Sequence, residues 1–401
     1  MNMKRIVLIL MIMLLSASSA LAADIRFDAE DIEKWDSIYL GEYNRTPIEW
    51  LIMDAEKSSM NEDGMFLITR YVLDQVHSSS VKYYPSSGLP AKCDALFNSF
   101  NNPEQGIVLS TSAARINEYL YDSKFKIVTD HEVDKEKIFL MSLTEFTKYL
   151  QNTSYAPLDF EWYLRSNTVS WQGQMLINEY GSASYTKQNS WYFRPCMNIN
   201  PAGAVFISPA EGGKESSIGL FPIEKGQNAS TWKLTLMDNT REFSASAAAQ
   251  VYSDDRKLVI DYSSSTISNN EYISAFLLDS EGNILFYGAL DKPNKYSGSL
   301  EITLPEGLEN GSYTLQVFSE QRNDSKHSDY VSAASELSFT LTDRPPVPDA
   351  GSPDTSLPEP EIPEIDLPRT GDTTSIMMWL ACFAASAAGA AALTARRKKL
   401  R

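Results

Sequence analysis

Apolar and polar residues alternate in the C-terminal half of the chain, between residues 230 and 342. Leu300, Ile302 and Leu304 illustrate the two-residue period of a half-buried strand. Turn residues such as Asn310 and Gly311 separate the runs. Seven short runs share this character: TWKLTLM, KLVIDY, YISAFLL, NILFYG, SLEITL, SYTLQVF and ELSFTLT. Seven strands in about 110 residues predict an all-β immunoglobulin-like sandwich over residues 230–342.

The preceding segment, residues 24–209, has a mixed pattern. IEWLIMDAE and GMFLITRYVL are predicted to be paired strands around a turn at residues 61–64. Ser142 and Glu145 form a capping box, which predicts a short helix through about Leu150.

Two stretches of different composition divide the chain further. Residues 210–229 are rich in Gly, Ser and charge and are predicted to be a linker. Residues 343–366 are acidic and rich in Pro, with almost no bulky apolar side chains, so they cannot form a core. We expect a disordered, extended spacer there.

The N-terminus has the pattern of a secretory signal. Lys4 and Arg5 are followed by an apolar run at residues 6–15, and small residues precede Ala22 and Ala23. Residues 1–22 are therefore expected to be a signal peptide that is cleaved between Ala22 and Ala23.

The C-terminus holds three signals in order. The motif is Leu367, Pro368, Arg369, Thr370 and Gly371; an apolar run follows at residues 376–395, and basic residues fill 396–401. The run has the length of a transmembrane helix, and the basic residues favour a cytoplasmic tail.

This ending resembles that of sortase substrates on Gram-positive cell walls. The resemblance implies that a sortase cleaves the chain after Thr370 and joins Thr370 to peptidoglycan. The helix at residues 376–395 would then hold only the precursor in the membrane. A permanent transmembrane anchor is the alternative.

Charge and cysteine content narrow the functional classes. Residues 23–370 carry 28 basic and 51 acidic residues, a net charge of about −23, which argues against nucleic-acid binding. Cys93 and Cys196 lie in one predicted domain, where either a disulfide or two separately buried thiols would be consistent with secretion.

Two further motifs resemble a domain-of-unknown-function family of Gram-positive surface proteins. They are EWYLRS at residues 161–166 and FRPCMNI at residues 193–199, together with the opening LGEYNRTPIEWLIMDAE. The resemblance implies an α+β fold similar to C-type lectins and sulfatase-modifying factors. Asn167, Thr168 and Cys196 depart from the family pattern.

Five residues near these motifs are candidates for ligand binding. Arg165 and Arg194 carry forked donors suited to carboxylates or carbonyls, and aromatic rings at Trp162, Trp171 and Trp191 suit sugars or peptides. The alternative role for Trp162, Arg165 and Arg194 is to support the fold.

Catalysis and metal binding find little support in the sequence. His131 lies between two acidic residues without a second histidine at helical spacing, so residues 130–132 are no zinc-protease motif. The acidic turn at residues 279–283 lacks the spaced carboxylates of a full calcium loop. We therefore predict no catalytic residue, metal site or cofactor, and calcium has no support beyond this turn.

These observations predict a surface protein that binds or adheres to an extracellular glycan or protein. The alternatives are a wall-spacing module without a ligand and an enzyme that acts on extracellular polymers.

Overall fold

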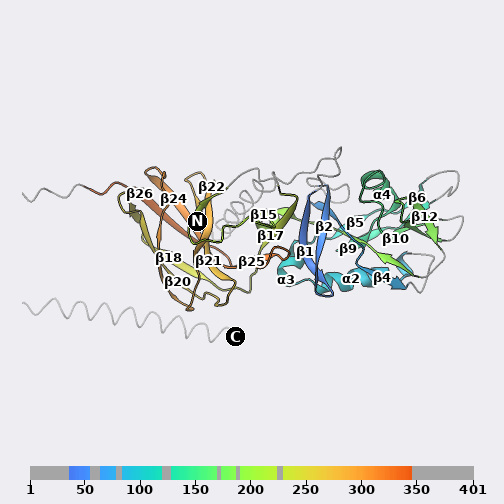
Figure 1. The fold of residues 1–401 in the computed structure, drawn as a ribbon, viewed down its shortest axis with the longest axis horizontal. Coiled ribbons are helices and arrows are strands. Elements are labelled where there is room, and N and C mark those ends of the chain that lie inside the picture. Colours follow the sequence, from blue (N-terminus) through green and yellow to red (C-terminus); the bar gives the residue numbers. More distant parts are fainter. Residues whose placement is uncertain are drawn as a thin grey trace, which may run out of the picture. The chain divides into compact units, whose positions relative to one another are not determined.

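The computed structural model describes residues 36–54, 64–77, 84–119, 128–168, 173–186, 190–223 and 229–345 (Figure 1). The predicted signal peptide, spacer, sortase motif, transmembrane helix and basic tail lie outside these residues, so they stay predictions. Contacts group residues up to Arg344 into one compact unit.

Strands dominate the N-terminal part of this unit. They are β1 (Ser37–Tyr43), β2 (Thr46–Asp54), β3 (Met65–Thr69), β4 (Asp74–His77), β5 (Thr111–Ala113), β6 (Ile116–Tyr119), β7 (Val128–Asp130), β8 (Val133–Glu136), β9 (Ile138–Leu140), β10 (Trp162–Thr168), β11 (Gly173–Ile177), β12 (Ala183–Thr186), β13 (Ser190–Phe193), β14 (Pro195–Ile199) and β15 (Ala204–Pro209).

The described helices are all short. They are α2 (Leu89–Ser99), α3 (Asn102–Ile107) and α4 (Leu143–Tyr149), with 3₁₀ turns η2 (Tyr84–Ser86) and η3 (Pro201–Gly203). Capping boxes start two of them: Asn101 with Glu104 at α3, and Ser142 with Glu145 at α4. Each box satisfies backbone groups at the first turn and so fixes where the helix begins.

The C-terminal part contains further strands. They are β16 (Phe221–Pro222), β17 (Thr231–Met237), β18 (Ser244–Ala247), β19 (Gln250–Tyr252), β20 (Lys257–Ser263), β21 (Glu271–Leu278), β22 (Ile284–Asp291), β23 (Gly298–Thr303), β24 (Gly311–Gln321), β25 (Asp329–Val331) and β26 (Ser335–Thr342).

One large sheet runs through both parts of the unit. Its order is β16-β22-β21-β24-β25-β17-β1-β2-β3-β14-β9, with β15, β19 and β26 paired off this path. The central strand β17 pairs in parallel with β1 through Thr231 and in parallel with β25 through Thr235. Strands almost 200 residues apart in sequence are thus direct neighbours.

Apolar faces of these strands form separate cores. In the C-terminal part, β20 and β23 of a three-stranded sheet pack on β21, β24 and β26 of the large sheet. The expected alternation is visible in β20, whose inward residues Leu258, Ile260 and Tyr262 are buried between exposed neighbours. Two further cores lie mainly in the N-terminal part, one of them around Trp50 and the other around Trp162. A fourth core packs β15 against β21, β22 and β24.

The predicted fold class is wrong in its main points. In place of an α+β lectin-like domain followed by an immunoglobulin-like sandwich, the described chain is mostly β throughout. Buried segments such as β10 and β14 pair as strands, while the capping boxes start helices of only six and seven residues. The C-terminal strands also do not close on themselves, because β25 and β17 continue their sheet to β1.

No helix among the described residues is long and apolar enough to cross a membrane. The transmembrane helix predicted for residues 376–395 lies outside this part of the chain.

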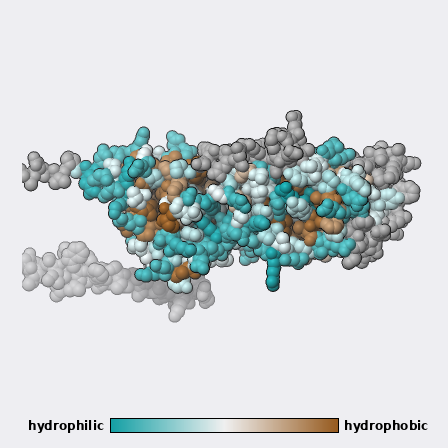
Figure 2. All heavy atoms as spheres, in the orientation of Figure 1, coloured by the Kyte–Doolittle hydropathy of each residue, from teal (hydrophilic) through white to brown (hydrophobic). Residues whose placement is uncertain are grey.

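Figure 2 shows a face on which hydrophilic residues predominate. Apolar residues gather on it in two places, over the C-terminal strands and over the N-terminal strands. This surface is in keeping with the acidic composition of the chain.

Candidate ligand-binding groove

Three of the predicted ligand-binding residues lie in the protein interior. The side chains of Trp162, Arg165 and Arg194 are at most 2% exposed. The Arg194 guanidinium lies 4.9 Å from the ring centroid of Trp162 and donates to the carbonyls of Thr69 and Tyr155. Burial lowers the pKa of Arg194 to about 10. These contacts connect the residue between β13 and β14 to β10, to the end of β3 and to the loop after α4.

Arg165 has a similar structural environment. Its guanidinium donates to both carboxylate oxygens of Glu145, the residue that closes the α4 capping box, and to the carbonyls of His131 and Leu140. Burial opposes its charge, but Glu145 keeps the pKa of Arg165 above the usual value. The pair therefore attaches the start of α4 to β10.

The other predicted residues give less information. Trp171 lies outside the described residues, and of Trp191 the structure describes only the backbone, in β13 opposite Val76. Cys93 and Cys196 are both buried free thiols, in different apolar clusters. Burial raises the pKa of each thiol, so neither is activated as a nucleophile.

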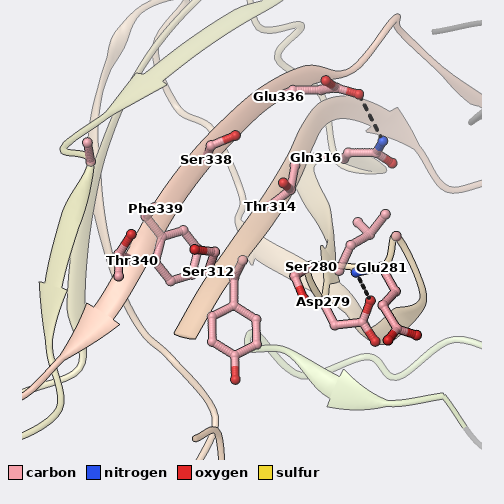
Figure 3. Close-up of a pocket in the computed structure, with 14 residues that line it drawn as sticks. Asp279, Ser280, Glu281, Ser312, Thr314, Gln316, Glu336, Ser338, Phe339 and Thr340 are labelled. Atoms are coloured by element: carbon pink, nitrogen blue, oxygen red, sulfur yellow. Dashed lines mark hydrogen bonds between the residues drawn. The ribbon is translucent and has the colours of Figure 1, made fainter. Parts of the chain in front are cut away.

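A groove in the C-terminal part is a stronger candidate for a ligand site. It encloses about 590 Å³, which is within the usual range for small-ligand sites. The lining residues come from the end of β21 and the turn after it, from β24 and from β26 (Figure 3). We call this site the outer groove.

Strand register places the polar residues of the outer groove in two neighbouring rows. Ser312, Thr314 and Gln316 on β24 lie opposite Thr340, Ser338 and Glu336 on β26. Their alternating neighbours Leu315 and Leu337 are buried in the core between the sheets. The two-residue period of each strand thus separates a polar face from an apolar one.

Most of these polar side chains remain available to a ligand. Gln316 donates to Glu336 at 3.2 Å. The hydroxyls of Ser312, Thr314, Ser338 and Thr340 have no side-chain hydrogen bond to any other described residue. Hydroxyls that donate and accept in fixed rows suit a ligand that is itself rich in hydroxyl or amide groups.

The charge of the outer groove limits which ligands fit it. Its charged lining residues are Asp279, Glu281 and Glu336, and no Lys or Arg lines it among the described residues. Such a lining repels phosphate and carboxylate groups and tolerates neutral or cationic ones. The Asp279 carboxylate is already used by its own turn, where it accepts from the backbone N–H groups of Glu281 and Asn283.

An aromatic pair lies on the core side of the two strands that carry the polar rows. The rings of Tyr313 and Phe339 stack with their centroids 5.8 Å apart, and the Tyr313 hydroxyl donates to the carbonyl of Glu309. Phe339 is buried in the core between the sheets, and the half-buried Tyr313 packs against that core. The pair therefore supports, from the core side, the strands that carry the polar rows.

A second hollow is lined by Glu42, Asn101, Glu104, Asp324 and His327, among other residues, and encloses about 680 Å³. Its polar groups largely bond to one another: His327 contacts both Asp324 and Glu42, and Glu104 accepts from the backbone of Gly41. It therefore offers a ligand fewer free groups than the outer groove.

The outer groove was not predicted from the sequence. Its residues are ordinary outward positions of alternating strands, and only the pairing of β24 with β26 makes them neighbours. The run of Ser and Thr at every second position in GSYTL and ELSFTLT was the available signal.

Comparison with known proteins gives no family. No family model matches the chain, and no curated protein matches it. Among solved structures, it resembles a β-D-glucuronidase of Dictyoglomus thermophilum, with 10% identity and a TM-score of 0.14. That match covers 77% of this chain and 42% of the enzyme, and at this TM-score it carries no argument about fold or activity. Among the described residues, no group of His, Cys, Asp or Glu could hold a metal ion.

Proposed function

We propose that the protein is a cell-wall-anchored surface protein that binds an extracellular glycan in the outer groove. The proposal of glycan binding rests on two rows of polar side chains with free hydroxyls. They lie on an exposed sheet face, and none of the described residues that line it is basic. The order of the motif at residues 367–371, the apolar run and the basic tail supports the anchoring half.

The ligand that suits the outer groove best is a neutral or amino-bearing glycan. Sugar hydroxyls complement the free Ser and Thr hydroxyls of the two polar rows. A peptide that binds by adding a strand is a poorer fit, because β26 pairs with β24 on one side and with β19 on the other.

Anchoring is tested by replacing the residue that sortase would join to the wall. Thr370→Ala should remove the protein from the peptidoglycan fraction and leave it with the membrane, because the acyl bond must form at this residue. Thr373→Ala, three residues further on, is the matched control and should anchor normally. Wall attachment of Thr370→Ala would contradict the proposal.

Binding is tested with the full chain on an array of neutral, amino-bearing and anionic glycans. Ser338→Trp should fill the outer groove and weaken binding by about tenfold or more, which corresponds to about 1.4 kcal/mol of binding free energy. Ser246→Trp is the control, because Ser246 is also an exposed strand residue but lies on β18, away from the groove.

Two outcomes would overturn the proposal that the outer groove binds a glycan. Equal loss of binding in both Trp variants would place the site elsewhere. A folded wild-type protein that binds no glycan of any class would favour the alternative of a wall-spacing module.

A further inference from the structure

Five charged side chains meet in the interior, at a place that the proposed function does not use. They are Lys214, Lys233, Glu320, Arg322 and Asp329, which we call the buried lysine cluster. Lys233 lies on β17 and Asp329 on β25, and these strands pair in parallel with Thr235 opposite Asp329. Glu320 lies on β24, the next strand beyond β25. Three neighbouring strands therefore fix the relative positions of Lys233, Asp329 and Glu320.

Both lysines contact the same carboxylate. Lys233 Nζ lies 2.7 Å from Asp329 Oδ1, and Lys214 Nζ lies 2.7 Å from Asp329 Oδ2. Lys214 Nζ also lies 2.7 Å from Glu320 Oε1, and Arg322 Nε lies 2.9 Å from Glu320 Oε2. The side chains of Asp329 and Glu320 are fully buried, and those of the lysines are less than a tenth exposed.

The cluster holds three cationic side chains for two carboxylates, so one amine is disfavoured as a cation. Burial lowers the pKa of Lys233, and the nearby Lys214 lowers it further against the opposing effect of Asp329. Burial also opposes the charge of Lys214, but Glu320 and Asp329 outweigh it and keep the pKa of Lys214 above its usual range. Lys233 is therefore the amine more readily available in its neutral, nucleophilic form.

We propose that the Lys233 amine condenses with the side chain of Asp329 to form an intramolecular isopeptide bond. The bond would join β17 covalently to β25. It is a self-modification that this chain's own residues bring about after folding.

Each part of the cluster has a role in the reaction. Lys233 Nζ attacks Cγ of Asp329 while the Lys214 ammonium gives a proton to Oδ2. The C–Oδ2 bond then breaks, and Oδ2 leaves as water with that proton and one from Lys233 Nζ. Lys214 recovers a proton from solvent, so the net change is amine plus carboxylate plus proton to amide plus water. Glu320 is a positioning residue, because it holds Lys214 against Asp329.

The surroundings favour condensation over the free ion pair. An unpaired or imperfectly solvated charge is costly in the interior, and an amide replaces a buried amine and carboxylate by one neutral group. The rings of Phe206 and Tyr287 lie 5.7 and 5.6 Å from Lys214 Nζ and limit the access of water. Fixing the two reacting groups in contact also replaces a bimolecular reaction by an intramolecular one.

The chain contains a matched ion pair in a different environment. Lys257 Nζ lies 2.6 Å from Glu301 Oε1, but both side chains are about half exposed. Water solvates both of these charges, so contact alone gives no reason for an amide to form there.

The test is mass spectrometry of the wild-type full chain after denaturation and proteolysis. A branched peptide that joins the Lys233 segment to the Asp329 segment, lighter than the two peptides by one water, is the expected result. The Lys257 and Glu301 segments should be recovered as separate peptides. Recovery of the Lys233 and Asp329 segments only as separate peptides would overturn the proposal, and so would a branch through Lys214.

Variants then test the roles of Lys233 as the nucleophile and of Lys214 as the proton donor. Lys233→Arg keeps the charge but should abolish the branched peptide, whereas Lys257→Arg should leave its yield unchanged. Lys214→Met should lower the yield at a given time after folding, and Lys214→Arg should restore part of it, because Lys214 supplies charge and a proton at Oδ2. A yield that is the same in all four variants would contradict the mechanism.

Discussion

Arg165 illustrates at the scale of single residues how charge is built into this interior. Its guanidinium and the Glu145 carboxylate are both buried, and each satisfies the other through two hydrogen bonds. Because Glu145 also closes the capping box of α4, a change at Arg165 acts on both the charge balance and the helix start.

Arg165→Met should destabilise the fold by about 3–5 kcal/mol, because it leaves the Glu145 charge buried without its partner. The free energy of unfolding in urea measures this. Arg344→Met is the control: Arg344 forms exposed pairs with Asp254 and Asp255, so its loss should change stability little. Similar effects of the two changes would contradict the structural role of Arg165.

His327 makes stability depend on pH. Its Nδ1 lies 2.6 Å from Asp324 Oδ1, and its Nε2 lies 2.7 Å from Glu42 Oε1. Partial burial opposes the charge, but these carboxylates raise the pKa of His327 above its ordinary 6.5. A pKa raised by folding means stability that is fully present below the unfolded pKa and is lost as pH rises through the folded pKa.

His327→Gln should therefore lower the free energy of unfolding most at about pH 6. The loss should become smaller toward about pH 8.5, as the wild-type imidazole loses its proton. Urea midpoints of both proteins across this range measure the difference. A difference that stays constant with pH would show that the imidazole does not titrate in these contacts.

At the scale of elements, the sequence predicts strands well where one face of a sheet is buried. Each of the seven alternating runs between residues 230 and 342 overlaps a strand, and the box at Ser142 starts α4 as expected. Alternation records which residues face the core, and a capping box records a local hydrogen-bond pattern. Both are properties of neighbouring residues, so the sequence alone reveals them.

Pairing between distant strands could not be predicted in this way. Nothing in TWKLTLM shows that β17 lies beside β1 and β25, because parallel partners leave no turn between them. The outer groove and the buried lysine cluster both depend on such pairings. Buried Arg165 and Arg194 were likewise candidates for binding as well as for support of the fold, because burial is decided by the whole fold.

Gly288 gives an element-scale prediction. A Cβ at this position of β22 would lie 1.9 Å from the carbonyl oxygen of Gly219, where the two backbones approach closely. Gly288→Ala should lower the free energy of unfolding by about 1–3 kcal/mol, because the strand or its neighbour must shift. A melting temperature lowered relative to wild type measures this effect.

Gly106→Ala is the matched control for this prediction. A Cβ there meets nothing within 4 Å, and Gly106 lies in α3, where Ala is the better helix former. It should leave the melting temperature unchanged or raise it. A loss of stability equal to that of Gly288→Ala would contradict the close approach as the cause.

At the scale of the whole compact unit, β17 connects the two groups of strands. It pairs with β1 through its first residues and with β25 through its last, so neither group has a complete sheet without it. This connection makes the two groups depend on each other for stability, and one apolar core contains residues of both, since Phe206 of β15 packs against Phe276 and Tyr287.

Calorimetry of the full chain should therefore show the described unit unfolding in one transition rather than two. Hydrogen exchange gives an independent measure: the slowest amides of β3 and β21 should exchange in the same global opening. Two well-separated transitions would show that β17 does not couple the groups.

The outer groove lies on the strand nearest to the C-terminal end of the described chain. β26 ends at Thr342, and its residues Glu336, Ser338 and Thr340 line the groove. A protein held at its C-terminus and pulled by a bound ligand would bear the force along β26 and its register with β24, from Ser335 to Leu341. The hydrogen bonds of that ladder would be loaded together in shear, and the N-terminal strands would bear little tension.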